Sequence, residues 1–368
     1  MSASPELLDS LAAQHPEIAE LIAERNKYRD ALQVNIPHFS NLGDVPPGHY
    51  YSPIPSIPDI RQDEARLFGN VSRTLPGIEF NEDAQVRLVE EFADKYYGQM
   101  PFEPHKKDGL RFYFENVMFS YGDATSLYCM IRHLRPRRIV EIGSGFSSAV
   151  SLDTNDLFFD GQIQCTFVEP NNERLLSLLT EKDKVTSKIV KSLAQDVDLS
   201  VFAELEANDI LFVDSSHVSK IGSDVNRIVF EILPILAPGV HVHFHDVFLP
   251  LEYPPQWIYE GRAWNEAYLL RAFLQYNSAF EVVLMNTFMG HFHADLMNAR
   301  MPLFMRNPGA SFWIRKDTLG AAAQTFHILR RFIDDFDERA RASRRRSVHA
   351  RRLARRRARN EDRPHRGA

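Results

Sequence analysis

Val140-Glu141-Ile142-Gly143-Ser144-Gly145 is the stretch that decides the fold of this 368-residue chain. It closes a short apolar run, residues 138–142, with two glycines, and Phe146-Ser147-Ser148 follows as the start of a helix. Glycine permits a tight turn and a close backbone approach to a ligand, and the free N–H groups at a helix start favour anions. The stretch therefore predicts a buried strand, a turn and a helix that together form a ligand loop.

Strands and helices alternate on the C-terminal side of this loop. The segments between the apolar runs fit helices, notably 173–179, 224–236 and 264–276. This alternation predicts an α/β fold with a Rossmann-like, seven-stranded, mostly parallel sheet and helices on both faces. Besides residues 138–142, we expect strands at 165–169, 188–190, 209–214, 240–246, 280–285 and 312–315.

The remaining sequence divides into segments of different composition. Apolar residues at spacings of three and four predict a helix over residues 1–35, and a proline-rich stretch, residues 45–55, follows. We expect an N-terminal helical and irregular extension over 1–105, the α/β core over 106–316, a C-terminal helix over 317–337 and a disordered tail over 338–368.

The tail is strongly basic, whereas the body is acidic. Residues 339–366 hold thirteen arginines against two acids, a net charge of +11, so the chain's total of −6 leaves −17 for the rest. Such a tail cannot bury enough apolar surface to fold alone. It could contact nucleic acid or an acidic membrane, or it could be a solvated terminus, since no aromatic residues interleave its arginines.

The expected cellular location of the protein and the state of its cysteines follow from signals that the sequence does not contain. No run approaches the ~18 apolar residues of a membrane span, and the first residues do not resemble a secretory signal. We therefore expect a cytoplasmic protein without a transmembrane segment. Cys129 and Cys165 have no metal or redox spacing and sit in apolar surroundings, which predicts buried free thiols.

Glu169 adds a second cofactor signal, because it ends the next predicted strand, 24 residues beyond Gly145. A carboxylate there can accept hydrogen bonds from the two hydroxyls of a ribose. Ser148 stands where a dinucleotide fold usually has its third glycine, and Glu141 would repel a pyrophosphate. The Glu141 carboxylate suits a cationic group of a ligand instead. S-adenosylmethionine offers an amine, a ribose diol and a sulfonium, and it carries no phosphate.

These motifs resemble a known family. Val140–Gly145 resembles the first motif of class I S-adenosylmethionine-dependent methyltransferases, and Phe167-Val168-Glu169-Pro170 resembles their ribose-binding segment. Residues 209–217, 236–239 and 243–246 resemble the branch grouped as methyltransferase domain type 24, which is similar to metal-assisted O-methyltransferases of small molecules and sugars. The resemblance covers about residues 123–285. It implies cofactor contacts by Glu141, Gly143 and Gly145 with the methionine part, by Glu169 with the ribose, and by the loop Ser192–Gln195 with the adenine.

The catalytic candidates follow the fourth and fifth predicted strands, whose ends are neighbours in such a sheet. In one mechanism Asp214 and Asp246, with or without a histidine, bind a divalent cation that assists loss of the acceptor's proton. Oxygen ligands favour magnesium, and a histidine ligand would allow manganese, iron or zinc. In the other, His217 or His245 is a metal-free general base. Family members often have a second acid where this chain has His245, a departure that bears on the metal. Each of these residues also has a purely structural interpretation. Asp214 could cap the turn after its strand, His217 could be a surface residue, and His241 and His243 could be core histidines.

We therefore expect methyl transfer from S-adenosylmethionine to an oxygen of a small molecule or sugar. One alternative is an NAD(P)-dependent oxidoreductase on a Rossmann sheet, although no third loop glycine or hydride-site pair is found. Another is a non-catalytic nucleic-acid-binding protein that uses the basic tail. The sequence does not define the methyl acceptor or the oligomeric state.

Overall fold

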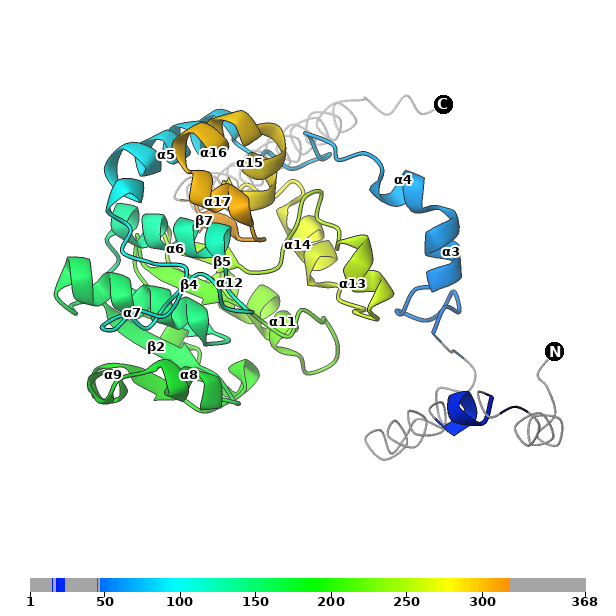
Figure 1. The fold of residues 1–368 in the computed structure, drawn as a ribbon, viewed down its shortest axis with the longest axis horizontal. Helices are drawn as coiled ribbons and strands as arrows, with labels where there is room; N and C mark the ends of the chain where they lie inside the picture. The colour runs from blue at the N-terminus through cyan, green and yellow to red at the C-terminus, as the bar shows by residue number, and fades with distance from the viewer. Residues whose placement is uncertain (1–14, 16–17, 24–44, 46, 318–368) are drawn as a thin grey trace, which may run out of the picture. The chain divides into compact units, whose positions relative to one another are not determined.

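The computed structural model describes residues 15, 18–23, 45 and 47–317. They contain a seven-stranded sheet of order β3-β2-β1-β4-β5-β7-β6 (Figure 1). Its strands are β1 (Arg138–Ile142), β2 (Gln164–Val168), β3 (Lys188–Val190), β4 (Ile210–Val213), β5 (His241–Phe244), β6 (Phe280–Met285) and β7 (Phe312–Lys316). Strand β7 runs antiparallel to β5 and β6, and the other paired strands are parallel. The predicted fold class is confirmed.

Helices connect and cover these strands. Those before and around the first half of the sheet are α3 (Ile57–Gln62), α4 (Glu64–Phe68), α5 (Glu82–Lys95), η2 (Tyr97–Gln99), α6 (Tyr121–Leu134), α7 (Phe146–Phe159), α8 (Glu173–Leu178), α9 (Glu181–Thr186), η3 (Ala194–Asp196) and α10 (Ser200–Ala203). The later ones are α11 (Asp224–Arg227), the π-helix η4 (Ile228–Ile232), α12 (Leu233–Ile235), α13 (Pro255–Tyr259), α14 (Glu266–Leu274), α15 (Asn286–Phe292), α16 (Ala294–Arg300) and α17 (Pro302–Arg306).

The core lies on both faces of the sheet. Every residue of β4 and β5 is buried, as a central strand covered on both sides requires. Helix α6 is buried over most of its length, because it packs between α7 and α17. Cys129 on α6 and Cys165 on β2 are buried free thiols, as the sequence predicted.

Helix α5 joins the same compact unit. The side chain of Gln85 accepts the backbone N–H of Met285 at 2.8 Å, and Val89 and Phe92 are buried. These contacts extend the unit to Val71, whereas the sequence places the start of the core near residue 106.

A second unit contains residues up to 70 together with 255–263. Within it, the guanidinium carbon of Arg61 lies 5.0 Å from the centre of the Tyr259 ring, which links α3 to α13. Residues 18–23 are helical, as predicted, and the rest of the predicted helix over 1–35 lies almost entirely outside the described residues. The predicted C-terminal helix, 317–337, and the tail, 338–368, also fall outside them, apart from Asp317.

Residues 286–306 differ from expectation. The sequence around His291 and His293 predicts a loop, but the structure places it in α15, α16 and α17, which lie beside α5 (Figure 1). The prediction failed because these helices are short, and packing on α5 and α6 decides their conformation. None of the helices in the described part of the chain is long and apolar enough to span a membrane.

Candidate active site

The loop after β1 turns sharply at Gly143, where φ is +78°. A Cβ atom at this position would lie 1.9 Å from the backbone oxygen of Asp214, so glycine is needed for the ends of β1 and β4 to pass each other. Gly145 is under no such constraint. A Cβ there would meet only the flexible side chain of Arg174, at 3.3 Å.

Glu141 lies beneath this loop and is fully buried. Its Oε1 accepts hydrogen bonds from the hydroxyls of Ser147 at 2.6 Å and Ser148 at 3.0 Å, at the start of α7. Its Oε2 has no partner among the described residues. Burial raises the pKa of Glu141 to about 8, and the two serines only partly oppose this effect. A buried carboxylate oxygen without a donor fits a ligand that brings a positive charge.

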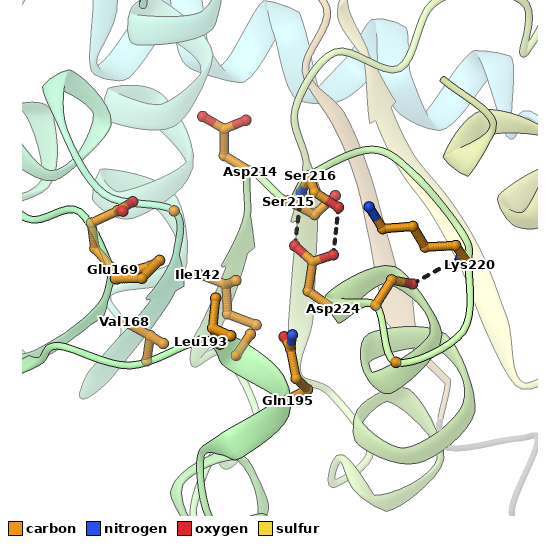
Figure 2. A pocket seen from close by; sticks show the side chains of 15 residues that line it. Ile142, Val168, Glu169, Leu193, Gln195, Asp214, Ser215, Ser216, Lys220 and Asp224 are labelled. Atoms are coloured by element: carbon orange, nitrogen blue, oxygen red, sulfur yellow. Dashed lines mark hydrogen bonds between the residues drawn. The ribbon is translucent and has the colours of Figure 1, made fainter. Parts of the chain in front are cut away.

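A cavity of about 340 Å³ opens beside the loop, at the carboxyl ends of the strands (Figure 2). Gly143, Glu169 and Asp214 line it from the ends of β1, β2 and β4. Lys220 and Asp224 close another side, and Asp224 is fixed by hydrogen bonds from the backbone N–H and hydroxyl of Ser216. The cavity therefore occupies the place where open α/β sheets bind ligands.

The second and third cofactor candidates lie differently in this cavity. Glu169 lines it, and its carboxylate accepts the backbone N–H of Ser144 at 3.2 Å. Ser192 does not line it, and its hydroxyl donates to the backbone oxygen of Leu193. The three residues after Ser192 do line it, and the buried Oε1 of Gln195 has no partner in the described structure. Within the loop Ser192–Gln195 that the resemblance implied, Gln195 is therefore a better cofactor candidate than Ser192.

The predicted catalytic residues meet at the ends of β4 and β5. Ligand atoms of Asp214, His217 and Asp246 all lie within 4.8 Å of one another. His217 Nε2 is 3.3 Å from Asp214 Oδ1 and 3.8 Å from Asp246 Oδ2. We call these three residues the Asp-His-Asp cluster. Two carboxylates and one imidazole are a donor set that suits a divalent cation, so the residues fit the implied metal.

The backbone supports this arrangement with unusual conformations. His217 and Asp246 both have φ of 58°, in the left-handed region that few non-glycine residues adopt. His217 is also held by Glu266, whose Oε2 lies 2.9 Å from Nδ1. Burial opposes a charge on His217, but hydrogen bonds with Asp214 and Glu266 and their charges raise its pKa to about 10.

His245 contacts three carboxylates. Its Nδ1 is 3.5 Å from both Asp214 Oδ1 and Asp246 Oδ1, and its Nε2 is 3.5 Å from Asp123 Oδ2. Neither ring nitrogen forms a hydrogen bond of good geometry within the described residues. Burial opposes its charge, yet the charges of Asp214 and Asp246 raise the pKa of His245 well above its ordinary value. For Asp214, burial is outweighed by His245 and His217, which hold its pKa well below the ordinary value.

The other two histidines of β5 lie outside this cluster. His243 donates to or accepts from the hydroxyl of Ser311 at 2.8 Å and stacks on Phe212, and burial lowers its pKa well below the ordinary value. His241 is buried at the opposite end of the strand, where burial lowers its pKa to about 4. Both fit the alternative of core histidines.

Two acidic residues of the site were missed from the sequence. Asp123 stands in the first turn of α6, and its Oδ1 accepts from the backbone N–H of Ala310 and the hydroxyl of Ser311. Glu266 begins α14 and is 1% exposed. Neither belongs to a local motif, so only the tertiary fold could bring them to His245 and His217.

Comparison with known proteins agrees with this site. The family model described as "Methyltransferase domain" matches residues 140–247. An uncharacterized protein of Archaeoglobus fulgidus is 35% identical over 171 residues, which cover 45% of this chain and 75% of that protein.

Solved methyltransferase structures are more distant. The SAH-bound methyltransferase PaMTH1 of Podospora anserina is 17% identical, with a TM-score of 0.34, and the match covers 71% of this chain and 96% of that one. The SAM complex of the O-methyltransferase TomG of Streptomyces achromogenes is 15% identical, with a TM-score of 0.37 and coverage of 70% and 96%. These scores are low, so the family assignment depends on the domain match.

That assignment replaces the oxidoreductase alternative. The matched region, residues 140–247, contains the glycine loop, Glu169 and the whole Asp-His-Asp cluster. The chain belongs to the methyltransferase domain family and is an S-adenosylmethionine-dependent methyltransferase.

Proposed function

We propose that this enzyme transfers the methyl group of S-adenosylmethionine to a hydroxyl oxygen of a small molecule or sugar, with a divalent cation held by Asp214 and Asp246. One observation carries the proposal. Asp214 both lines the cofactor cavity and belongs to the Asp-His-Asp cluster. A methyl donor in the cavity would therefore lie next to groups that can take a proton from an acceptor.

Two of the groups that would hold the cofactor, Glu141 Oε2 and Gln195 Oε1, lack partners in the described structure, whereas Glu169 already accepts two backbone N–H groups. Glu141 Oε2 suits the amine of the methionine part, Glu169 the ribose hydroxyls and Gln195 Oε1 the adenine amino group. Gly143 and Gly145 bring the backbone of the loop to the methionine part, whereas Ser192 contributes through the loop that it begins. In each of these contacts the protein oxygen accepts a hydrogen bond and the cofactor's amine, hydroxyl or amino group donates it.

Methyl transfer is a direct displacement, so placement and proton removal are what the protein must supply. The acceptor oxygen forms the new O–C bond as the C–S bond breaks, and the sulfur keeps the electron pair. A bound divalent cation would lower the pKa of the acceptor hydroxyl. Asp214 and Asp246 would supply oxygen ligands for it, and the proton of the acceptor hydroxyl would leave to water.

A metal-free mechanism is the second candidate. It is favoured by the contact of His217 Nδ1 with Glu266, since a carboxylate that orients a histidine is also the arrangement of a general base. His217 or His245 would then take the acceptor's proton directly, in the fraction of the enzyme in which that ring is neutral, because the neighbouring carboxylates raise the pKa of both histidines.

The test combines binding and turnover with the purified full-length protein. We expect S-adenosylmethionine to bind in calorimetry, and S-adenosylhomocysteine to form with a panel of catechols, sugars and other hydroxylated compounds. EDTA should lower turnover by about 100-fold or more and leave cofactor binding intact. Turnover that survives EDTA would favour the metal-free base. No binding at millimolar S-adenosylmethionine would refute the proposal.

A further inference from the structure

We infer that His217 is a nitrogen ligand positioned by Glu266, and that the cluster consequently selects a first-row transition ion over magnesium. This inference rests on the proposed metal at Asp214 and Asp246. It assigns the histidine ligand to His217 and adds Glu266, which the sequence did not suggest, as the carboxylate that supports it.

The orientation of the His217 ring is fixed from several sides. Glu266 holds Nδ1 at 2.9 Å and is itself fixed by the hydroxyl of Ser215, which donates to Oε1 at 2.9 Å. The indole ring of Trp264 lies against the imidazole, with ring centres 4.2 Å apart. The backbone N–H of His217 also donates to Ser215 Oγ at 2.9 Å. Such a ring cannot turn without breaking buried contacts.

This orientation leaves Nε2 facing the two aspartates. When Glu266 accepts the Nδ1 proton and a metal displaces the proton on Nε2, the Nε2 lone pair faces the site, 3.3 Å from Asp214 Oδ1. A carboxylate behind a histidine is the arrangement that sets the tautomer of metal-bound histidines and raises their basicity. Glu266 is therefore a positioning residue, acting through His217.

A second imidazole points to the same place. His245 is nine-tenths buried, makes no hydrogen bond in the described structure, and places Nδ1 3.5 Å from both aspartates. The ring lies at ion-pair distance from Asp123, Asp214 and Asp246, and a cation bound between the two aspartates would meet its Nδ1. Two imidazoles and two carboxylates form a mixed nitrogen and oxygen set.

Mixed donor sets discriminate between cations. Magnesium prefers oxygen ligands in a regular octahedron and keeps several waters, whereas imidazole favours manganese, iron, cobalt, nickel or zinc. The His-rich composition of this cluster therefore predicts tighter binding of Co²⁺ than of Mg²⁺. It also predicts that a bound paramagnetic ion is coupled to histidine nitrogen.

The experiment uses full-length protein stripped with chelator, titrated with Mg²⁺, Mn²⁺ and Co²⁺, and examined by pulsed EPR with bound Mn²⁺. We expect Co²⁺ to bind more tightly than Mg²⁺ and Mn²⁺ to show ¹⁴N modulation that weakens in His217→Ala. Glu266→Gln should lower the Co²⁺ affinity by about 10- to 100-fold. His291→Ala and Glu231→Gln, exposed and distant from the site, should match the wild type.

Cofactor binding and circular dichroism check that each variant is folded, and the wild-type EPR signal tests the inference even where a variant fails to fold. Metal binding without ¹⁴N modulation, or with equal affinity for Mg²⁺ and Co²⁺, would overturn the inference and leave the proposed metal-assisted reaction standing. No binding of any of the three ions would overturn both.

Discussion

The two halves of the site are built in different ways. The cofactor half is formed by the loops after β1, β2 and β3, and the loop after β4, which holds Lys220 and Asp224, closes it. The catalytic half gathers Asp123, Asp214, Asp246 and Glu266 from four separate elements around two histidines. Local backbone geometry shapes the first half, whereas tertiary packing and charge balance shape the second.

Asp246→Asn is the substitution expected to affect the catalytic half most strongly while leaving the cofactor half unchanged. The amide keeps the size of the side chain and tolerates the left-handed backbone, but it removes the negative charge. We expect kcat to fall by roughly 10²- to 10⁴-fold, because proton removal and cation binding both depend on that charge. The dissociation constant for S-adenosylmethionine should not change, since Asp246 does not line the cofactor cavity.

Asp295→Asn is the matched control, because Asp295 is exposed on α16. It should leave kcat and cofactor binding unchanged. If Asp246→Asn weakened cofactor binding as strongly as it lowered turnover, the two halves would not be separable and the comparison would fail.

Gly143→Ala changes the place where the cofactor half meets the catalytic half, at the contact between Gly143 and Asp214. The added methyl group would collide with the backbone oxygen of Asp214 and would also occupy a positive φ, so we expect a loss of about 2 kcal/mol in unfolding free energy. Cofactor binding should weaken in parallel. Gly145→Ala, which meets only the Arg174 side chain, should cost much less. Denaturant unfolding of both variants measures the two losses in unfolding free energy. Equal losses in Gly143→Ala and Gly145→Ala would contradict the structure.

Glu141→Gln tests the cofactor half alone, through pH. The free carboxyl has a pKa of about 8, so it is mostly protonated at pH 7. A cationic amine binds the ionised form, and its binding therefore releases close to one proton at pH 7. Affinity for S-adenosylmethionine should rise as pH increases towards the pKa of Glu141, about 8, and fall above it, where the α-amine of the ligand loses its charge. Calorimetry in buffers of different ionisation enthalpy measures the released proton.

In Glu141→Gln the proton release should vanish and the affinity at pH 8 should fall by about tenfold. Because glutamine carries no charge to desolvate, the variant should remain folded. Proton release that persisted in this variant would assign the titration to another group.

The sequence predicted the strand and turn of the cofactor half because their signals are local. The run 138–142 matches β1, Gly143 needs its glycine, and Glu169 lies in the cavity. It failed for Asp123 and Glu266, which are separated from their histidines by many residues and lie in helices without any motif. It also failed for α15–α17, whose short helices are determined by packing.

The left-handed backbone at His217 and Asp246 has a consequence for engineering. Aspartate, asparagine, histidine and glycine enter this conformation readily, whereas other side chains pay about 1–2 kcal/mol. A saturation library at these two positions should therefore return folded enzymes mainly with those four residues. The φ angles of His217 and Asp246 therefore restrict which metal-binding side chains can be introduced at these two positions. A glutamate or cysteine ligand would require the two loops to be rebuilt first.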